Sequence, residues 1–145
     1  MHLLTGDLWE MHAQGEIIAI TTGGMVDKNG GCAMPRGCAG QARERFPGIE
    51  VVLGSLISRY GNHVYDIGNR IISFPVEASP FENPDPQLIE RSCHELIELV
   101  DRCGWQKVIV PRPGCGGGGL EWREVQRILD PIFDDRFHVI SQEEL

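Results

Sequence analysis

The sequence predicts an α/β protein, a three-layer α/β/α sandwich around a mixed central sheet. Two observations lead to this prediction. Segments typical of strands occur both in succession and in alternation with segments typical of helices, which favours a mixed sheet over a purely parallel one. The 145 residues, 41% of them hydrophobic and 23% charged, suffice for one domain and are too few for two ordinary ones. We therefore expect residues 1–145 to form a single domain.

The first predicted element is a short buried strand over residues 16–21, an apolar run bounded by glycine. After a long polar loop, a helix is predicted over residues 32–46, where alanines recur at helical spacing. Pro35 can occupy its first turn, and Pro47 follows its end.

Three further strands are expected after this helix, because each segment is short, apolar and bounded by turn-forming residues. They span residues 51–57, 63–67 and 70–74. The Gly68-Asn69 pair between the last two predicts a tight hairpin.

The clearest helix is predicted from Pro86 to Cys103. Asp85 is a suitable N-cap, Pro86 fits the first helical position, and Gly104 stands just after the end. Apolar residues recur along one face of this helix. The remaining predicted elements are a strand over residues 107–110, a helix over 120–129 and a closing strand over 136–140.

The charge balance narrows the class of partner. Thirteen Lys and Arg against 21 Asp and Glu give a net charge of −8, which argues against a duplex-DNA-binding surface. Backbone amides and helix N-termini can still bind a small phosphorylated ligand. No apolar run approaches the ~20 residues of a membrane helix, and the first ten residues lack a signal-peptide pattern. We expect a cytoplasmic protein with no membrane partner.

Cysteine and histidine spacing gives no indication of a metal centre. The five cysteines are odd in number and contain no Cys-x-x-Cys pair, which favours reduced thiols. The five histidines are scattered without metal-ligand spacing. We therefore expect neither a metal site nor a bound cofactor.

Two glycine-rich loops carry the functional prediction. The first spans residues 21–34 and the second residues 110–122, and each lies between a predicted strand and a predicted helix. Strand carboxyl ends are where open α/β sheets bind ligands, so two such loops can hold one diphosphate from both sides. The alternative is a pair of surface turns. A Walker A loop is excluded because no Gly-Lys-Ser or Gly-Lys-Thr follows, and the glycine spacing disfavours a dinucleotide-binding fold.

Six stretches, in this order along the chain, resemble the macrodomain family. They are Gly6-Asp-Leu-Trp9, Ile20-Thr-Thr-Gly-Gly24, Asn29-Gly-Gly-Cys-Ala33, Arg43-Glu-Arg-Phe-Pro-Gly48, Ser73-Phe-Pro-Val76 and Pro113-Gly-Cys-Gly-Gly-Gly-Gly-Leu-Glu-Trp122. The sequence is most similar to the branch with terminal ADP-ribose glycohydrolases and antitoxins that remove ADP-ribose from DNA. The resemblance implies a compact α/β/α fold that binds ADP-ribose in a cleft at the crest of the sheet.

The resemblance also implies a role for particular residues. Asp7 is expected to accept a hydrogen bond from the adenine amino group, with the Leu8 amide beside it, and Gly23 is expected beside the distal ribose. The first phosphate-binding loop is expected to consist of Asn29, Gly30, Gly31, Cys32 and Ala33. The second is expected to consist of Gly114, Cys115, Gly116, Gly117, Gly118 and Gly119.

Three positions depart from the family pattern. Gly23 replaces a polar residue, often Asn; Glu77 stands where hydrolases of this branch have a Lys; and Gly118 stands where they have an Asp. A nucleophile and an assisting acid are thus missing, and we expect no catalytic residues. The favoured function is a binding module for ADP-ribose or a related nucleotide, free or attached to a protein or nucleic acid. The alternatives are an ADP-ribosyl hydrolase with a non-standard catalytic set and a general nucleotide-diphosphate binder.

Overall fold

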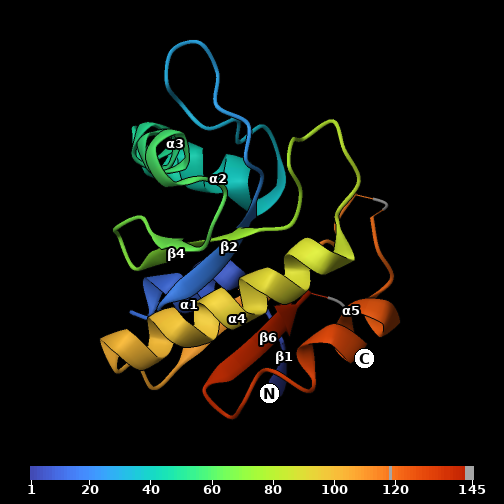
Figure 1. The fold of residues 1–145 in the computed structure, drawn as a ribbon. Helices are drawn as coiled ribbons and strands as arrows, with labels where there is room; N and C mark the ends of the chain where they lie inside the picture. Colours follow the sequence, from blue (N-terminus) through green and yellow to red (C-terminus); the bar gives the residue numbers. More distant parts are fainter. Residues whose placement is uncertain (118, 143–145) are drawn as a thin grey trace.

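A computed structural model describes residues 1–117 and 119–142 of the chain. Its sheet has six strands in the order β1-β6-β5-β2-β4-β3. Figure 1 shows the sheet between the helices. The strands are β1 (His2–Thr5), β2 (Ile18–Thr22), β3 (Tyr65–Asp66), β4 (Ile71–Pro75), β5 (Val108–Pro111) and β6 (Phe137–Ser141). All neighbours are parallel except β3, which pairs antiparallel with β4. The predicted mixed sheet is confirmed.

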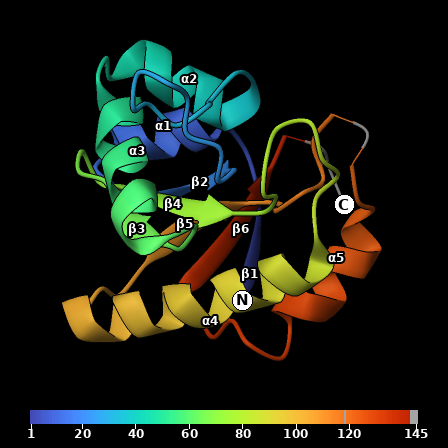
Figure 2. The ribbon, with the colours of Figure 1, turned by 45° about the horizontal axis from the view of Figure 1, so that its top comes forward.

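Helices cover both faces of the sheet. They are α1 (Leu8–Ala13), α2 (Gly37–Arg45), α3 (Ile49–Tyr60), α4 (Pro86–Cys103) and α5 (Trp122–Leu129). Figure 2 shows α1, α2 and α3 on one side and α4 and α5 on the other. The three-layer α/β/α arrangement is therefore the one predicted. In the part of the chain that the structure describes, no helix combines the length and the apolar character needed to cross a bilayer.

The two faces of the sheet have separate hydrophobic cores because side chains alternate along each strand. Ile18 and Ile20 of β2 pack with the α1–α3 layer, whereas Ala19 between them packs with the α4–α5 layer. All three side chains are fully buried. The buried central strands explain why the sequence shows continuous apolar runs at these positions.

The largest correction concerns residues 51–57, which form part of helix α3 and not a strand. Ile49 and Leu53 are buried one helical turn apart, whereas Val51 and Val52 are 51% and 46% exposed. A helix buries the first pair on one face and leaves the two valines in solvent. The apolar, β-branched composition of the run favoured the wrong element because periodicity separates short buried strands from helices poorly.

The helix predicted over residues 32–46 begins later, at Gly37. Pro35 therefore precedes the helix and does not occupy its first turn. The amide of Cys32 donates to Glu50 O (2.8 Å) and that of Ala33 to Met25 O (2.8 Å). These tertiary hydrogen bonds hold residues 32 and 33 in a non-helical path.

Two short elements near the N-terminus were not predicted. Strand β1 pairs in parallel with β6, and helix α1 begins after Asp7, whose Oδ1 accepts a hydrogen bond from Trp9 N (2.8 Å). They have four and six residues, which is too short for a clear periodic signal.

Capping and turn-forming residues predicted the positions of other elements correctly. Helix α4 spans Pro86–Cys103 as predicted, with the Asp85 carboxylate accepting from Gln87 N and Gly104 in the left-handed conformation (φ +69°). The predicted hairpin joins β3 to β4 through Gly68 and Asn69, both at positive φ. The strand predicted over 63–67 is shorter, at Tyr65–Asp66.

Candidate functional site

A cleft of about 300 Å³ lies at the carboxyl ends of three adjacent parallel strands, β5, β2 and β4. Three connections border it: the first glycine loop after β2, the second glycine loop after β5, and the β4–α4 connection, residues 76–85. The N-terminus of α2 also lines the cleft through Arg36 and Gly37. In Figures 1 and 2 the three connections emerge from the same edge of the sheet.

The first glycine loop is held by its own side chains. Asp27 Oδ1 accepts hydrogen bonds from Asn29 N (2.9 Å) and Gly31 N (3.1 Å). Val26 and Cys32 form an antiparallel bridge across the loop. These contacts fold residues 26–32 back on themselves.

Helix α3 also supports the first glycine loop, by close backbone packing. A Cβ on Gly54 would collide with the carbonyl oxygen of Gly30 and would lie 2.9 Å from Cys32 N. The loop backbone therefore lies directly on the helix, and only glycine at position 54 permits the contact. Gly54 was not predicted as part of the site. An isolated glycine within an apolar run is nevertheless a sequence signal for close backbone packing.

The second glycine loop is held mainly by its backbone. Leu120 N donates to Gly114 O (2.8 Å), and Gly119 N donates to Gly116 O (3.2 Å). Gly114 (φ +73°) and Gly117 (φ +61°) adopt the left-handed region that favours glycine. Helix α5 begins after this loop at Trp122, two residues later than predicted, because the amide of residue 120 closes the loop.

The cleft contains charges of both signs. Arg112 lies at the start of the second loop with its guanidinium 4.8 Å from the Trp122 ring, and Arg36 donates a hydrogen bond to Pro80 O (2.8 Å). Both arginines line the cleft and were not among the predicted site residues. Two cations and the N-terminus of a helix make this edge of a strongly acidic protein suitable for an anion.

Glu77 supplies an acidic group on the same cleft. Burial raises the pKa of its carboxyl above the usual value, an effect that nearby Arg36 opposes and Glu82 reinforces. The carboxyl lies against Gly23, where an added Cβ would be 3.4 Å from Glu77 Cγ and 3.7 Å from Oε1.

The structure brings part of the predicted site together in this cleft. The predicted residues that line it are Gly23, Ala33, Gly114, Gly116, Gly117 and Gly119. Asn29, Gly31 and Cys32 lie with Ala33 along a second hollow on the other side of the first loop. Gly30 packs against Gly54 of α3.

The other predicted residues lie elsewhere or outside the described chain. Asp7 and Leu8 are at the N-terminus of α1, beyond β6, where the Asp7 carboxylate caps the helix. Leu8 is buried. Gly118 falls outside the described residues.

The thiols near the cleft are poor nucleophiles. Burial, together with nearby Asp27, raises the pKa of Cys32 to about 11. Burial likewise raises the pKa of Cys115 to about 11, although Arg112 opposes the shift. Both side chains stay protonated near neutral pH, so neither loop carries an activated thiolate.

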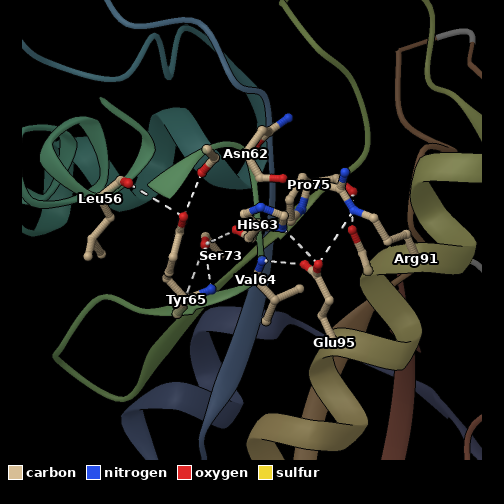
Figure 3. Close-up of polar contacts among 11 residues, drawn as sticks. Leu56, Asn62, His63, Val64, Tyr65, Ser73, Pro75, Arg91 and Glu95 are labelled. Atoms are coloured by element: carbon tan, nitrogen blue, oxygen red, sulfur yellow. Dashed lines mark hydrogen bonds and ion pairs between the residues drawn. The ribbon is translucent and has the colours of Figure 1, made fainter. Parts of the chain in front are cut away.

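A polar network joins the α3–β3 connection to α4 and, through Asn62, to the backbone of Glu77 (Figure 3). Glu95 of α4 accepts from Val64 N (3.0 Å) and pairs with His63 Nδ1 (2.8 Å), so it tethers the α3–β3 connection to α4. Asn62, in the same connection, donates from Nδ2 to Glu77 O (3.2 Å) and accepts from Arg91. The sequence did not indicate this network, because its members come from three separate elements.

Among residues 1–117 and 119–142, no group of three or more His, Cys, Asp or Glu side chains is arranged to hold a metal ion.

Comparison with protein-family models and with curated protein sequences finds no match. Comparison with solved structures finds macrodomains. The macrodomain of Thermus aquaticus DarG is 21% identical, with a TM-score of 0.79 over 99% of this chain and 97% of that one. The macrodomain of Mycobacterium tuberculosis DarG is 24% identical, with a TM-score of 0.77 over 95% of each chain. Thermosipho africanus DarTG in complex with ADP-ribose gives 19% identity and a TM-score of 0.76, over 95% of this chain and 40% of that one.

The chain thus has the macrodomain fold, with its cleft at the carboxyl edge of the sheet. The expectation drawn from the sequence motifs is confirmed at the level of the fold.

Proposed function

We propose that the chain is a binding module for ADP-ribose, free or attached to a macromolecule. The observation that carries the proposal is the cleft between the two glycine loops, at the carboxyl ends of neighbouring parallel strands. A diphosphate there meets loop amides, the N-terminus of α2 and two arginines. A protein of the same fold is seen in complex with ADP-ribose, which supports the choice of ligand.

We propose that the ligand lies along the order of the strands. Asp7 follows β1, the second loop follows β5, the first loop follows β2, and Glu77 lies beyond β4. Adenine at Asp7 and a diphosphate between the loops place the terminal ribose near Glu77. A carboxylate at Asp7 recognises the adenine amino group as an acceptor.

A panel of ligands tests the proposal. We expect ADP-ribose to raise the melting temperature of the protein, with smaller shifts for ADP, AMP and NAD. A ligand at 100 times its Kd adds about 2.7 kcal/mol to the free energy of unfolding. Equal shifts for ADP-ribose and ADP would favour a general nucleotide-diphosphate binder, and no shift with any of them would overturn the proposal.

The adenine end needs a variant that separates binding from helix capping. Asp7→Ala removes the N-cap of α1 and so costs about 0.5–2 kcal/mol of stability by itself. Asp7→Asn keeps an oxygen for Trp9 N but presents an amide donor to the adenine amino group. We expect Asp7→Asn to weaken ADP-ribose by about 1.5–3 kcal/mol and to leave ribose 5-phosphate unchanged in calorimetry. Equal loss for both ligands would make Asp7 structural.

The hydrolase alternative has its own test. Incubation with ADP-ribosylated DNA and with glutamate- or serine-modified peptides should release no ADP-ribose at an ordinary enzymatic rate, because Glu77 has no amine to attack the anomeric carbon. Binding of the same substrates must be measured in the same buffer. Turnover near 1 per second or faster would establish the alternative.

A further inference from the structure

The side chain of Glu77 lies in contact distance of the position that a Cβ on residue 23 would take. Gly23 is buried at the end of β2 and Glu77 follows the neighbouring strand β4. An added Cβ on Gly23 would be in ordinary contact with Glu77 Cγ, 3.4 Å away. Gly23 is absent from the glycines at positive φ, so its backbone does not require glycine. The two positions therefore lie side by side in the cleft, and Glu77 provides the polar group there.

The backbone around Glu77 is fixed on both sides. Gly24 N donates to Ala78 O (3.0 Å), and Asn62 Nδ2 donates to Glu77 O (3.2 Å). Gly24 packs so closely on Asn62 that an added Cβ would lie 2.6 Å from Asn62 Cγ. Figure 3 shows Asn62 at the edge of the network centred on Glu95. Because the backbone is held in this way, the Glu77 side chain starts from a fixed point at the edge of the cleft.

A carboxylate in this position favours a hydroxyl over a phosphate. Its charge repels a diphosphate, whereas its two oxygens accept hydrogen bonds from sugar hydroxyls, as acidic residues do with ribose in other nucleotide sites. Partial burial strengthens such a hydrogen bond and also penalises an unpaired charge. The raised pKa of Glu77 reflects that penalty, which a ribose donor would relieve.

We propose that Glu77 is the residue that makes the cleft specific for the terminal ribose of ADP-ribose, because its carboxylate accepts hydrogen bonds from the ribose hydroxyls in place of the side chain that Gly23 lacks. The inference rests on the proposed function, which places the ribose at the β4 end of the cleft. ADP ends in a phosphate and offers this carboxylate only repulsion. ADP-ribose binding should therefore depend on Glu77, and ADP binding should not.

Calorimetry of the full chain with ADP-ribose and with ADP tests the inference. The wild-type protein should prefer ADP-ribose by about tenfold or more. Glu77→Ala should weaken ADP-ribose by about 10- to 100-fold, the range for a hydrogen bond to a charged group, and should leave ADP unchanged or slightly tighter. The preference should then disappear. Thermal unfolding of each variant without ligand reports whether the fold survives.

Two further variants separate recognition from charge. Glu82→Gln removes a carboxylate that also lines the cleft but is exposed. It should change ADP and ADP-ribose affinity by the same factor. Gly23→Asn in the Glu77→Ala background restores a polar group to the vacated space, so it should recover part of the preference for ADP-ribose.

The results distinguish failure of this inference from failure of the proposed function. The role of Glu77 is overturned if Glu77→Ala leaves tight ADP-ribose binding unchanged, or if it lowers the affinities for ADP and ADP-ribose equally. Either result leaves the proposed binding function intact. A wild-type protein that binds neither nucleotide overturns both. If Glu82→Gln changes the preference for ADP-ribose over ADP as much as Glu77→Ala does, the preference depends on charge alone. That result also overturns the inference.

Discussion

The two glycine loops border the same cleft but are stabilised in different ways. The first loop is held by the Asp27 carboxylate, by a bridge between Val26 and Cys32, and by direct packing on Gly54 of α3. The second loop has backbone hydrogen bonds and glycines at positive φ, and Gly116 and Gly117 are exposed.

This difference suggests a division of roles between the loops. The path of the first loop is set by side chains and by a helix, so it is formed before a ligand arrives. The path of the second loop depends on the conformational freedom of glycine, and the amides of its exposed glycines can bind a ligand. Substitutions should therefore damage the first loop through stability and the second through binding.

The largest effect is expected for Gly54→Ala. The added methyl group collides with the backbone at Gly30 and Cys32, so either the loop or α3 must move. We expect a loss of about 1–3 kcal/mol in the free energy of unfolding, the usual cost of overpacking, measured by urea denaturation. ADP-ribose affinity should fall as well, because the displaced loop borders the cleft.

The neighbouring exposed Ser55 provides a control on the same helix. Ser55→Ala should raise the free energy of unfolding by no more than a few tenths of a kcal/mol, because alanine has the higher helix propensity. An unchanged or increased stability in Gly54→Ala would show that the loop does not depend on α3.

Gly117→Val should abolish ADP-ribose binding and leave the fold nearly intact. Apart from its neighbours in the chain, no atom of the described residues lies within 4 Å of the added Cβ, but φ is +61°, a region that a β-branched residue resists. The loop must change its path to accept valine. Calorimetry measures the loss of binding, and circular dichroism and thermal unfolding measure the fold.

A matched control is Gly104→Val at the C-terminus of α4, where φ is +69° and the added Cβ is also free of contacts. It should reduce stability by a similar amount and leave ADP-ribose binding unchanged, since Gly104 is remote from the cleft. If Gly117→Val retains wild-type affinity, the second loop has no part in binding.

A smaller effect is expected for Asp27→Ala. It removes the carboxylate that accepts from the amides of Asn29 and Gly31. Asp27 is exposed, so water replaces part of each hydrogen bond, and stability should fall by no more than about 1 kcal/mol. ADP-ribose affinity should fall by about three- to tenfold because the first loop is less well ordered. A loss of affinity as complete as that in Gly117→Val would contradict a first loop braced by several contacts.

The smallest effects concern the thiols of the two loops. With pKa values of about 11 for Cys32 and Cys115, only about one thiol in a thousand is ionised at pH 8. Alkylation by iodoacetamide, followed by mass spectrometry, should be slow at both and faster as the pH rises toward 11. Cys115 should react before Cys32, which is only 2% exposed. Rapid modification of Cys115 at pH 7 would mean an activated thiolate in the second loop.

Sequence motifs located both loops, but only part of the site. Gly116 and Gly117 were predicted from a run of glycines that no ordinary turn requires, and they line the cleft. Arg36 and Arg112 line it too, and nothing in their local sequence distinguishes them from surface arginines. Their place in the cleft follows from where α2 begins and where β5 ends.

Local chemistry was sufficient for α4, because its N-cap, first-turn proline and C-terminal glycine act within a few residues of the chain. It was insufficient for α3, where an apolar run fits a strand or a helix equally well. Burial of Ile49 and Leu53 against the sheet, with Gly54 against the first loop, decided between them.

The sequence by itself determined the α/β class, the positions of the glycine loops and the presence of a glutamate, not a lysine, at position 77. Only the tertiary structure decided that Glu77 lies beside Gly23, since these residues are 54 positions apart (77 − 23) and follow two paired strands. Hydrogen bonding between β2 and β4 aligns Thr22 with Pro75 and brings the segments that follow these strands together. Strand register is a long-range property, and no local pattern in the chain encodes it.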